Sequence, residues 1–141
     1  MAEGRNLVLC LDGTANTFSE VNTNVVHLFR AIEQDSEAQR AYYDPGVGTF
    51  STLALQSPAL KRLGQALGAA FGYGVTKNVL DAYRYLMAEY RDGDRVFLFG
   101  FSRGAYTARA LAGMLHHVGL LYRGSDNLVP YAMHKYLARA E

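Results

Sequence analysis

Residues 96–105 read Val96-Phe97-Leu98-Phe99-Gly100-Phe101-Ser102-Arg103-Gly104-Ala105, an apolar run that closes in the pattern Gly-x-Ser-x-Gly and leads into a helical pattern. A serine hydroxyl becomes accessible to a substrate when a sharp strand-to-helix turn lifts it above the edge of a sheet. Gly100 and Gly104 suit such a turn, because a strained backbone at the serine leaves no room for a Cβ atom on either flank. We therefore interpret Ser102 as the serine of a nucleophile elbow.

The five-residue pattern alone is weak evidence, because chance produces it in roughly one glycine-rich sequence of this length in twenty. The neighbouring strands and helices make the interpretation specific. Residues 7–11 form a continuous apolar run, which is typical of a strand buried on both faces of a parallel sheet. Further strands are predicted at Ala41–Tyr43 and Arg95–Phe99.

Helical patterns separate and follow these strands. Thr23 or Asn24 can cap the first helix. The second pattern spans residues 58–90, and its glycines predict a break near Gly72-Tyr73-Gly74. The third covers residues 103–117 and ends at Gly119, and the last covers residues 127–140 with Pro130 near its first turn.

Strands that alternate with helices predict right-handed crossovers and a three-layer α/β/α fold with a parallel sheet. Only three strands are visible, and sheets of this class usually carry more. At least one sheet edge is therefore expected to pair with sequence absent from this chain or with another chain.

Composition narrows the class of protein. The chain has 141 residues, of which 50% are hydrophobic and 19% charged, as in an ordinary globular domain. A net charge of +1 without long runs of like charge predicts neither a nucleic-acid partner nor a polybasic membrane anchor. No signal peptide or transmembrane segment is visible, so we expect the chain to be cytoplasmic as synthesised. No metal-ligand spacing is visible, and we expect no metal and no cofactor.

Several separate motifs in the right order resemble one known family, the α/β-hydrolase domains of unknown function related to the phospholipase effectors of bacterial type VI secretion. The likeness extends from Leu7 to Leu121. The matching pieces are Leu9-Cys10-Leu11-Asp12-Gly13-Thr14, Asn24-Val25, Tyr43-Asp44-Pro45-Gly46-Val47-Gly48-Thr49, Phe71-Gly72-Tyr73-Gly74, Ala82-Tyr83-Arg84-Tyr85-Leu86 and residues 93–109.

The resemblance implies a partial α/β-hydrolase fold, with residues 1–141 as the N-terminal portion of the domain, truncated after the elbow helix. It implies a serine hydrolase of acyl esters, lipase-like or phospholipase-like, with Ser102 as the nucleophile. The backbone N–H of Arg103, with that of Gly13 or Thr14 in the first loop, is the expected oxyanion hole. The effector relatives also imply export by a system that reads no N-terminal signal.

The Asp and His of the expected triad are missing from this chain, because such domains carry both after later strands. Asp126 and His134 follow Ser102 in the right order, but no strand returns them to the same sheet edge. His116 and His117 lie about 20 Å from Ser102 by helical rise. The alternative function is therefore a non-catalytic half-domain that acts as a binding or assembly module.

Two other chemistries fit less well. Asp12-Gly13-Thr14 after a buried strand resembles the loop of phosphatases with an aspartate nucleophile, but Cys10 stands where the attacking carboxylate belongs. We expect Asp12 to organise its loop by accepting backbone hydrogen bonds instead. The glycines at residues 72–74 match no phosphate-binding loop.

Overall fold

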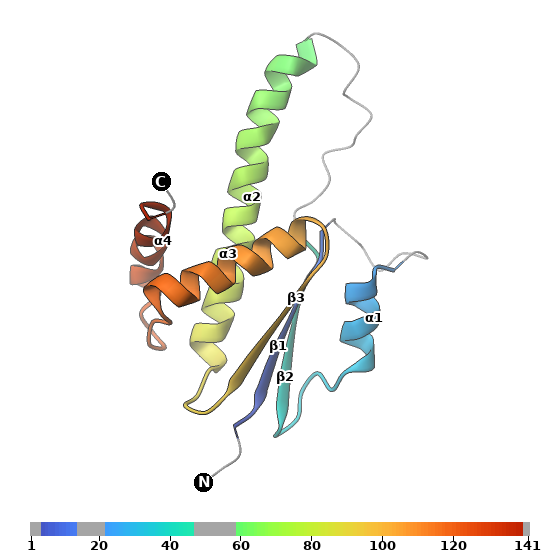
Figure 1. The fold of residues 1–141 in the computed structure, drawn as a ribbon, viewed down its shortest axis with the longest axis vertical. Helices are drawn as coiled ribbons and strands as arrows, with labels where there is room; N and C mark the ends of the chain where they lie inside the picture. The colour runs from blue at the N-terminus through green and yellow to red at the C-terminus, as the bar shows by residue number, and fades with distance from the viewer. Residues whose placement is uncertain (1–3, 14–21, 47–58, 140–141) are drawn as a thin grey trace.

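The computed structural model describes residues 4–13, 22–46 and 59–139. The elements follow the order β1 (Asn6–Leu11), α1 (Asn24–Ala31), β2 (Gln39–Asp44), α2 (Ala59–Glu89), β3 (Arg95–Gly100), α3 (Arg103–Val118), the 3-10 turn η2 (Asp126–Leu128) and α4 (Val129–Leu137). Strands and helices alternate along the chain as the sequence predicts (Figure 1).

In the described ranges the three strands form one parallel sheet with the order β2-β1-β3. Leu9 at the centre of β1 pairs with Tyr42 on one side and Leu98 on the other. Because all three strands run the same way, their carboxyl ends meet at one edge, where the loop after β1 faces the turn after β3. This edge positions the candidate site.

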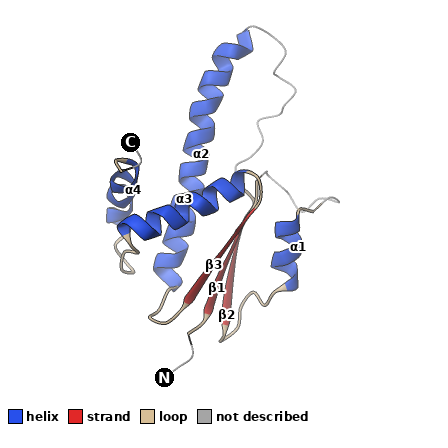
Figure 2. Cartoon of the chain, viewed as in Figure 1, coloured by secondary structure: helices blue, strands red, loops and turns tan. Residues whose placement is uncertain are grey.

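Helices cover both faces of the sheet, which gives the predicted three-layer α/β/α arrangement (Figure 2). On one face, alternate residues of β1 pack with α2, α3 and α4 in the main core, whose largest fully buried members include Leu7, Leu9, Leu11, Val79, Tyr83, Leu86, Leu111, Met114 and Val129. On the other face, Val8 and Cys10 pack against Val25 of α1. Burial on both faces explains why β1 is apolar at every position from Leu7 to Leu11.

The helix ends follow local sequence rules. Thr23 caps α1, and its Oγ1 accepts a hydrogen bond from the Val26 N–H at 3.3 Å. Gly119 ends α3 with φ 82°, a conformation that glycine adopts without steric cost. Pro130 lies in the first turn of α4, where its missing N–H has no partner to lose.

The predicted break near Gly72-Tyr73-Gly74 is wrong, because α2 runs unbroken from Ala59 to Glu89. Glycine within a helix costs about 1 kcal/mol relative to alanine, yet it keeps its N–H donor and does not interrupt the hydrogen-bond ladder. In Figure 1 the N-terminal part of α2 extends beyond the carboxyl edge of the sheet.

At the opposite edge of the sheet, Arg5 and Asp94 tie the starts of β1 and β3 together. The Arg5 guanidinium lies 2.8 Å from Asp94 Oδ2, and the Arg5 N–H donates to Asp94 Oδ1 at 2.9 Å. Burial alone would raise the pKa of Asp94, but the hydrogen bonds from Arg5 outweigh it and hold the pKa below its usual value.

Candidate active site around Ser102

Ser102 occupies the turn between β3 and α3 in a strained backbone conformation. Its φ is 54° and its ψ is −121°, and among the described residues it is the one non-glycine residue with positive φ. These angles match the first central position of a type II′ turn, where glycine is normally required. The side chain is exposed, and its hydroxyl does not cap α3. Strained residues cluster at active sites, so this conformation makes Ser102 a candidate functional residue.

The first loop lies directly against this serine. A Cβ atom added to Gly13 would lie 2.7 Å from Ser102 Cβ and 2.7 Å from the Phe101 carbonyl oxygen. No side chain larger than hydrogen fits between the two segments without a shift of backbone. The structure thus brings the predicted residues Gly13 and Ser102 together, although they are distant in sequence.

The flanking glycines are needed for the same close packing. A Cβ on Gly100 would lie 2.7 Å from the Cα of Ala105, and one on Gly104 would lie 2.8 Å from the Asp12 carbonyl oxygen. The first contact is between strand and helix, and the second is between helix and the end of β1. Both glycines therefore permit α3 to begin immediately after β3.

Asp12 lies at the centre of a buried hydrogen-bond network, with 2% of its surface exposed. Its Oδ1 accepts from the Gly13 N–H at 2.8 Å, and its Oδ2 accepts from Thr23 Oγ1 at 2.5 Å and from the Tyr43 hydroxyl at 3.0 Å. Burial, and then the bond to Asp12, raise the pKa of Tyr43, so this hydroxyl remains a donor. Asp12 thus links the first loop to α1 and β2.

The side chains of Thr23 and Tyr43 in this network were not predicted from the sequence. The sequence predicts a helix cap at Thr23 or Asn24; Thr23 fills that role, and its hydroxyl also donates to Asp12. A hydroxyl can accept one hydrogen bond and donate another at the same time. A threonine cap that follows an acidic loop could therefore have indicated the hydrogen bond to Asp12.

The Arg103 side chain returns from the start of α3 to the first loop, where its Nε donates to the carbonyl oxygen of Gly13. The Gly13 N–H is already donated to Asp12 Oδ1. Both backbone polar groups of Gly13 therefore have partners. Thr14, the other predicted first-loop donor, lies outside the described residues.

The loop after β2 supports the first loop from the other side. Gly46 has φ 79°, and a Cβ there would lie 3.0 Å from the Asp12 carbonyl carbon. Asp44 Oδ1 accepts from the Gly46 N–H at 2.8 Å and from Asn78 Nδ2 at 3.3 Å. Burial raises the pKa of Asp44 even though the Gly46 hydrogen bond opposes the shift.

The histidines named from the sequence lie at the other end of α3 or beyond it. His116 and His117 are in the last turn of α3, and the ring of His117 stacks on Tyr136 of α4 at a centroid distance of 6.3 Å. His134 is in α4 and Asp126 in η2. In Figure 1, α4 lies at the end of α3 that is remote from the turn between β3 and α3. The structure does not bring any of these four residues to the serine.

Two further observations limit the chemistry of the described residues. Cys10 is fully buried, and burial raises its pKa to about 11, so its thiol is neutral at physiological pH. In the described ranges, no group of three or more His, Cys, Asp or Glu side chains is placed to hold a metal ion.

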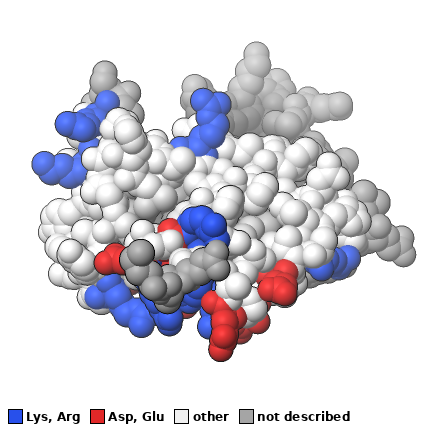
Figure 3. Space-filling model, turned by 60° about the horizontal axis from the view of Figure 1, so that its bottom comes forward, with Lys and Arg blue, Asp and Glu red and all other residues white. Residues whose placement is uncertain are grey.

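The face of the molecule in Figure 3 carries both positive and negative side chains. Lys and Arg side chains lie beside Asp and Glu along the lower margin of this face, and uncharged side chains cover most of the remainder. None of the described helices is long and apolar enough to cross a membrane.

Fold and site together define a class, an open parallel α/β protein with a strained serine between strand and helix and a glycine loop packed against it. Residues 5–141 match the family described as T6SS, phospholipase effector Tle1-like, catalytic domain. The chain belongs to this family.

A relative in yeast extends the comparison. The chain is similar to the uncharacterized protein YEL023C of Saccharomyces cerevisiae (strain ATCC 204508 / S288c), with 37% identity over 141 residues. The alignment covers 96% of this chain and 21% of the yeast protein, so the chain spans about a fifth of that relative. No solved structure matches the chain.

Proposed function

We propose that the chain is the nucleophile-bearing portion of an α/β-hydrolase domain, and that Ser102 attacks the carbonyl carbon of an acyl ester, with a phospholipid as the substrate class. The observation that carries the proposal is the exposed Ser102 at φ 54° on a strand-to-helix turn. Membership of a phospholipase effector family supports the lipid substrate. Secretion without an N-terminal signal is part of the proposal and is supported by the same description.

In the first step, Ser102 Oγ forms a bond to the carbonyl carbon and passes its proton to a histidine base. The carbonyl oxygen becomes an oxyanion that accepts hydrogen bonds from backbone N–H groups. We assign these donors to Arg103, at the positive end of α3, and to the first loop. Because the Gly13 N–H is donated to Asp12, the first-loop donor assigned is the N–H of Thr14.

The intermediate then collapses, the ester C–O bond breaks, and the alcohol leaves with the proton from the histidine. Water repeats the sequence on the acyl-enzyme and releases the acid. The histidine and its aspartate partner are assigned to residues outside this chain. This assignment is supported by the distance of His116, His117 and His134 from Ser102, and by the greater length of the yeast relative.

An active-site fluorophosphonate probe tests the assignment in the full reading frame that carries this chain. The wild-type protein is expected to be labelled at Ser102, and Ser102→Ala is expected to lose the label. Ser125→Ala is the matched control, since Ser125 lies just before η2 at the other end of the molecule, and it is expected to leave labelling unchanged. Labelling that persists in Ser102→Ala would falsify the nucleophile assignment.

The second candidate function, a non-catalytic assembly module, is favoured by the outer edge of the sheet. Within the described ranges β3 pairs only with β1, and Phe97, Phe99 and Phe101 are 42%, 41% and 52% exposed. An apolar strand edge of this kind can pair with a further strand, from the same protein or from another chain. A protein that is never labelled by the probe but binds through this edge would favour the module.

A further inference from the structure

The side chain of Arg103 crosses from α3 to the first loop and holds one particular atom, the carbonyl oxygen of Gly13, through its Nε. The two residues are separated by 90 positions in sequence, and the hydrogen bond is partly buried. Gly13 itself is buried against the backbone of the serine turn. The contact is therefore a link between the two segments that surround Ser102.

This link restrains the carbonyl group of Gly13. Glycine is the residue whose backbone rotates most readily, since it has no Cβ to restrict φ and ψ. The peptide group that precedes Gly13 is fixed by the hydrogen bond from its N–H to Asp12 Oδ1 at 2.8 Å. Arg103 supplies the second restraint, so both sides of the most rotatable residue in the loop are held.

The orientation matters because a peptide group presents either a donor or an acceptor to a neighbouring charge. A carbonyl oxygen turned toward the serine would repel the negative charge that develops on the substrate oxygen during attack. The hydrogen bond from the Arg103 guanidinium keeps the Gly13 carbonyl from rotating toward the serine. Because the donor is charged, this hydrogen bond is stronger than one from a neutral group.

We propose that the Arg103 side chain is a positioning residue, which holds the Gly13 carbonyl and so keeps it away from the oxyanion of the transition state. This role rests on the proposed function of Ser102. It is distinct from the role of the Arg103 backbone N–H, which side-chain substitution leaves in place.

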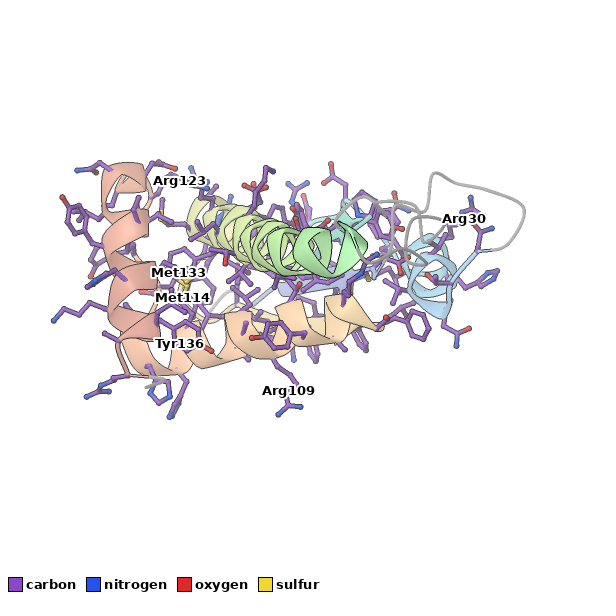
Figure 4. The ribbon with its side chains drawn as sticks, turned by 90° about the horizontal axis from the view of Figure 1, so that it is seen from above. Arg30, Arg109, Met114, Arg123, Met133 and Tyr136 are labelled. Carbon is purple, nitrogen blue, oxygen red and sulfur yellow. The ribbon has the colours of Figure 1, made fainter. Side chains whose placement is uncertain are left out.

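The test measures kcat and KM separately in the full reading frame that carries this chain. Arg103→Met removes the donor and keeps most of the stem, Arg103→Lys keeps the charge without the guanidinium fork, and Arg109→Met is the matched control. Arg109 is exposed on the same helix and projects away from the fold (Figure 4). The substrates are a neutral ester, p-nitrophenyl butyrate, and vesicles of anionic phosphatidylglycerol.

For Arg103→Met we expect kcat to fall about 10-fold to 100-fold on both substrates while KM changes less than about twofold, because only the transition state carries the oxyanion. Arg103→Lys is expected to recover only part of the loss, and Arg109→Met to match the wild type. Thermal unfolding of each variant shows whether the fold is kept, and Arg103→Lys provides the kinetic answer if Arg103→Met does not fold.

Two results would overturn the proposal. A rise in KM for phosphatidylglycerol alone, with the neutral ester unaffected, would assign Arg103 to head-group binding instead. Kinetics equal to those of Arg109→Met on both substrates would show that the link has no role in the reaction. Failure of the proposed function gives a different result, since either the wild-type protein would hydrolyse neither ester or Ser102→Ala would hydrolyse both at the wild-type rate.

Discussion

Ser102 combines two properties that follow from one backbone conformation, an exposed hydroxyl and local strain. A non-glycine residue at φ 54° and ψ −121° costs about 1 to 3 kcal/mol relative to an ordinary turn. The cost is offset by the contacts that hold the turn, namely the packing of Gly13 beneath the serine and of Gly104 against the end of β1. The conformation that exposes the Ser102 hydroxyl therefore lowers the free energy of unfolding locally.

Replacing the serine with glycine should recover part of this cost. Ser102→Gly is expected to be about 1 kcal/mol more stable than Ser102→Ala, because both variants lack the hydroxyl and only glycine adopts positive φ without strain. Urea denaturation of the 141-residue chain measures the difference in the free energy of unfolding.

Ser125 provides the control, since its φ of −92° is ordinary for any residue. There the order should reverse, with the glycine variant less stable than the alanine variant, because glycine loses more backbone entropy on folding. If alanine is the more stable replacement at both positions, the strain at Ser102 is refuted.

At the scale of single elements, the local sequence predicts where most strands and helices begin and end. Tertiary contacts decide whether a helix continues through residues of low helix propensity. The apolar run at residues 7–11 and the Gly-x-Ser-x-Gly pattern locate β1, β3 and the start of α3 to within about one residue, because burial and turn chemistry act locally. The continuity of α2 through its glycines was not predicted, since propensity is a weak effect that context overrides.

Some features of the candidate site are likewise predicted by the sequence, and others depend on tertiary contacts. The sequence predicts Ser102 and Gly104 because the turn requires their residue types, and it predicts Gly13 through the family resemblance, as part of the first loop. The bond from Arg103 to Gly13 was not predicted, because nothing in the sequence states which of several polar groups a long side chain will meet across 90 residues. Contacts of this kind become visible only when the strand order is known.

The link between the starts of β1 and β3 should give the fold a measurable dependence on acid. The pKa of Asp94 is lowered in the folded state, so its contribution to stability is complete above the unfolded value of about 4 and is lost as the pH falls through the folded pKa. We expect the wild-type free energy of unfolding to fall below about pH 4. Asp94→Asn should weaken that dependence and cost about 3 kcal/mol at pH 7, because the buried Arg5 guanidinium would keep its bond to the Glu89 carbonyl but lose its carboxylate partner.

Asp81→Asn is the matched control for this experiment. Its carboxylate pairs with Lys77 across one turn of α2, and the side chains are 35% and 63% exposed, against 3% for Asp94. Exposed pairs contribute less than about 1 kcal/mol, so this variant should differ little from the wild type. Denaturant unfolding at several pH values from 2 to 7 compares the three proteins; an equal loss in both variants would contradict a special role for the buried pair.

At the scale of the whole molecule, the two faces of the sheet are covered unequally. In the described ranges the main core fills the α2 and α3 side over all three strands, whereas α1 packs on β1 and β2. Phe97 and Phe99 of β3 lie on the α1 side and remain about two-fifths exposed. The exposed side chains of Phe97 and Phe99 therefore lie on the same strand as the unpaired outer edge of the described sheet.

This coincidence predicts that the 141-residue chain associates through β3. Phe99→Lys should reduce the association, because a charge on an edge strand opposes strand pairing. Tyr131→Lys on α4, where the side chain is 71% exposed, should leave it unchanged. Sedimentation velocity at tens of micromolar protein gives the masses; a monomeric wild-type chain, or equal effects of the two substitutions, would refute the prediction.

The packing of Gly13 against Ser102 also predicts an order of events during folding. The serine turn is held by a loop that precedes it by about ninety residues, so it gains its restraints only after β1 and β3 have paired across that separation. Closing so long a loop is slow compared with forming α3 locally. We therefore expect the Ser102 hydroxyl to reach its exposed position late, after most of the fold has formed.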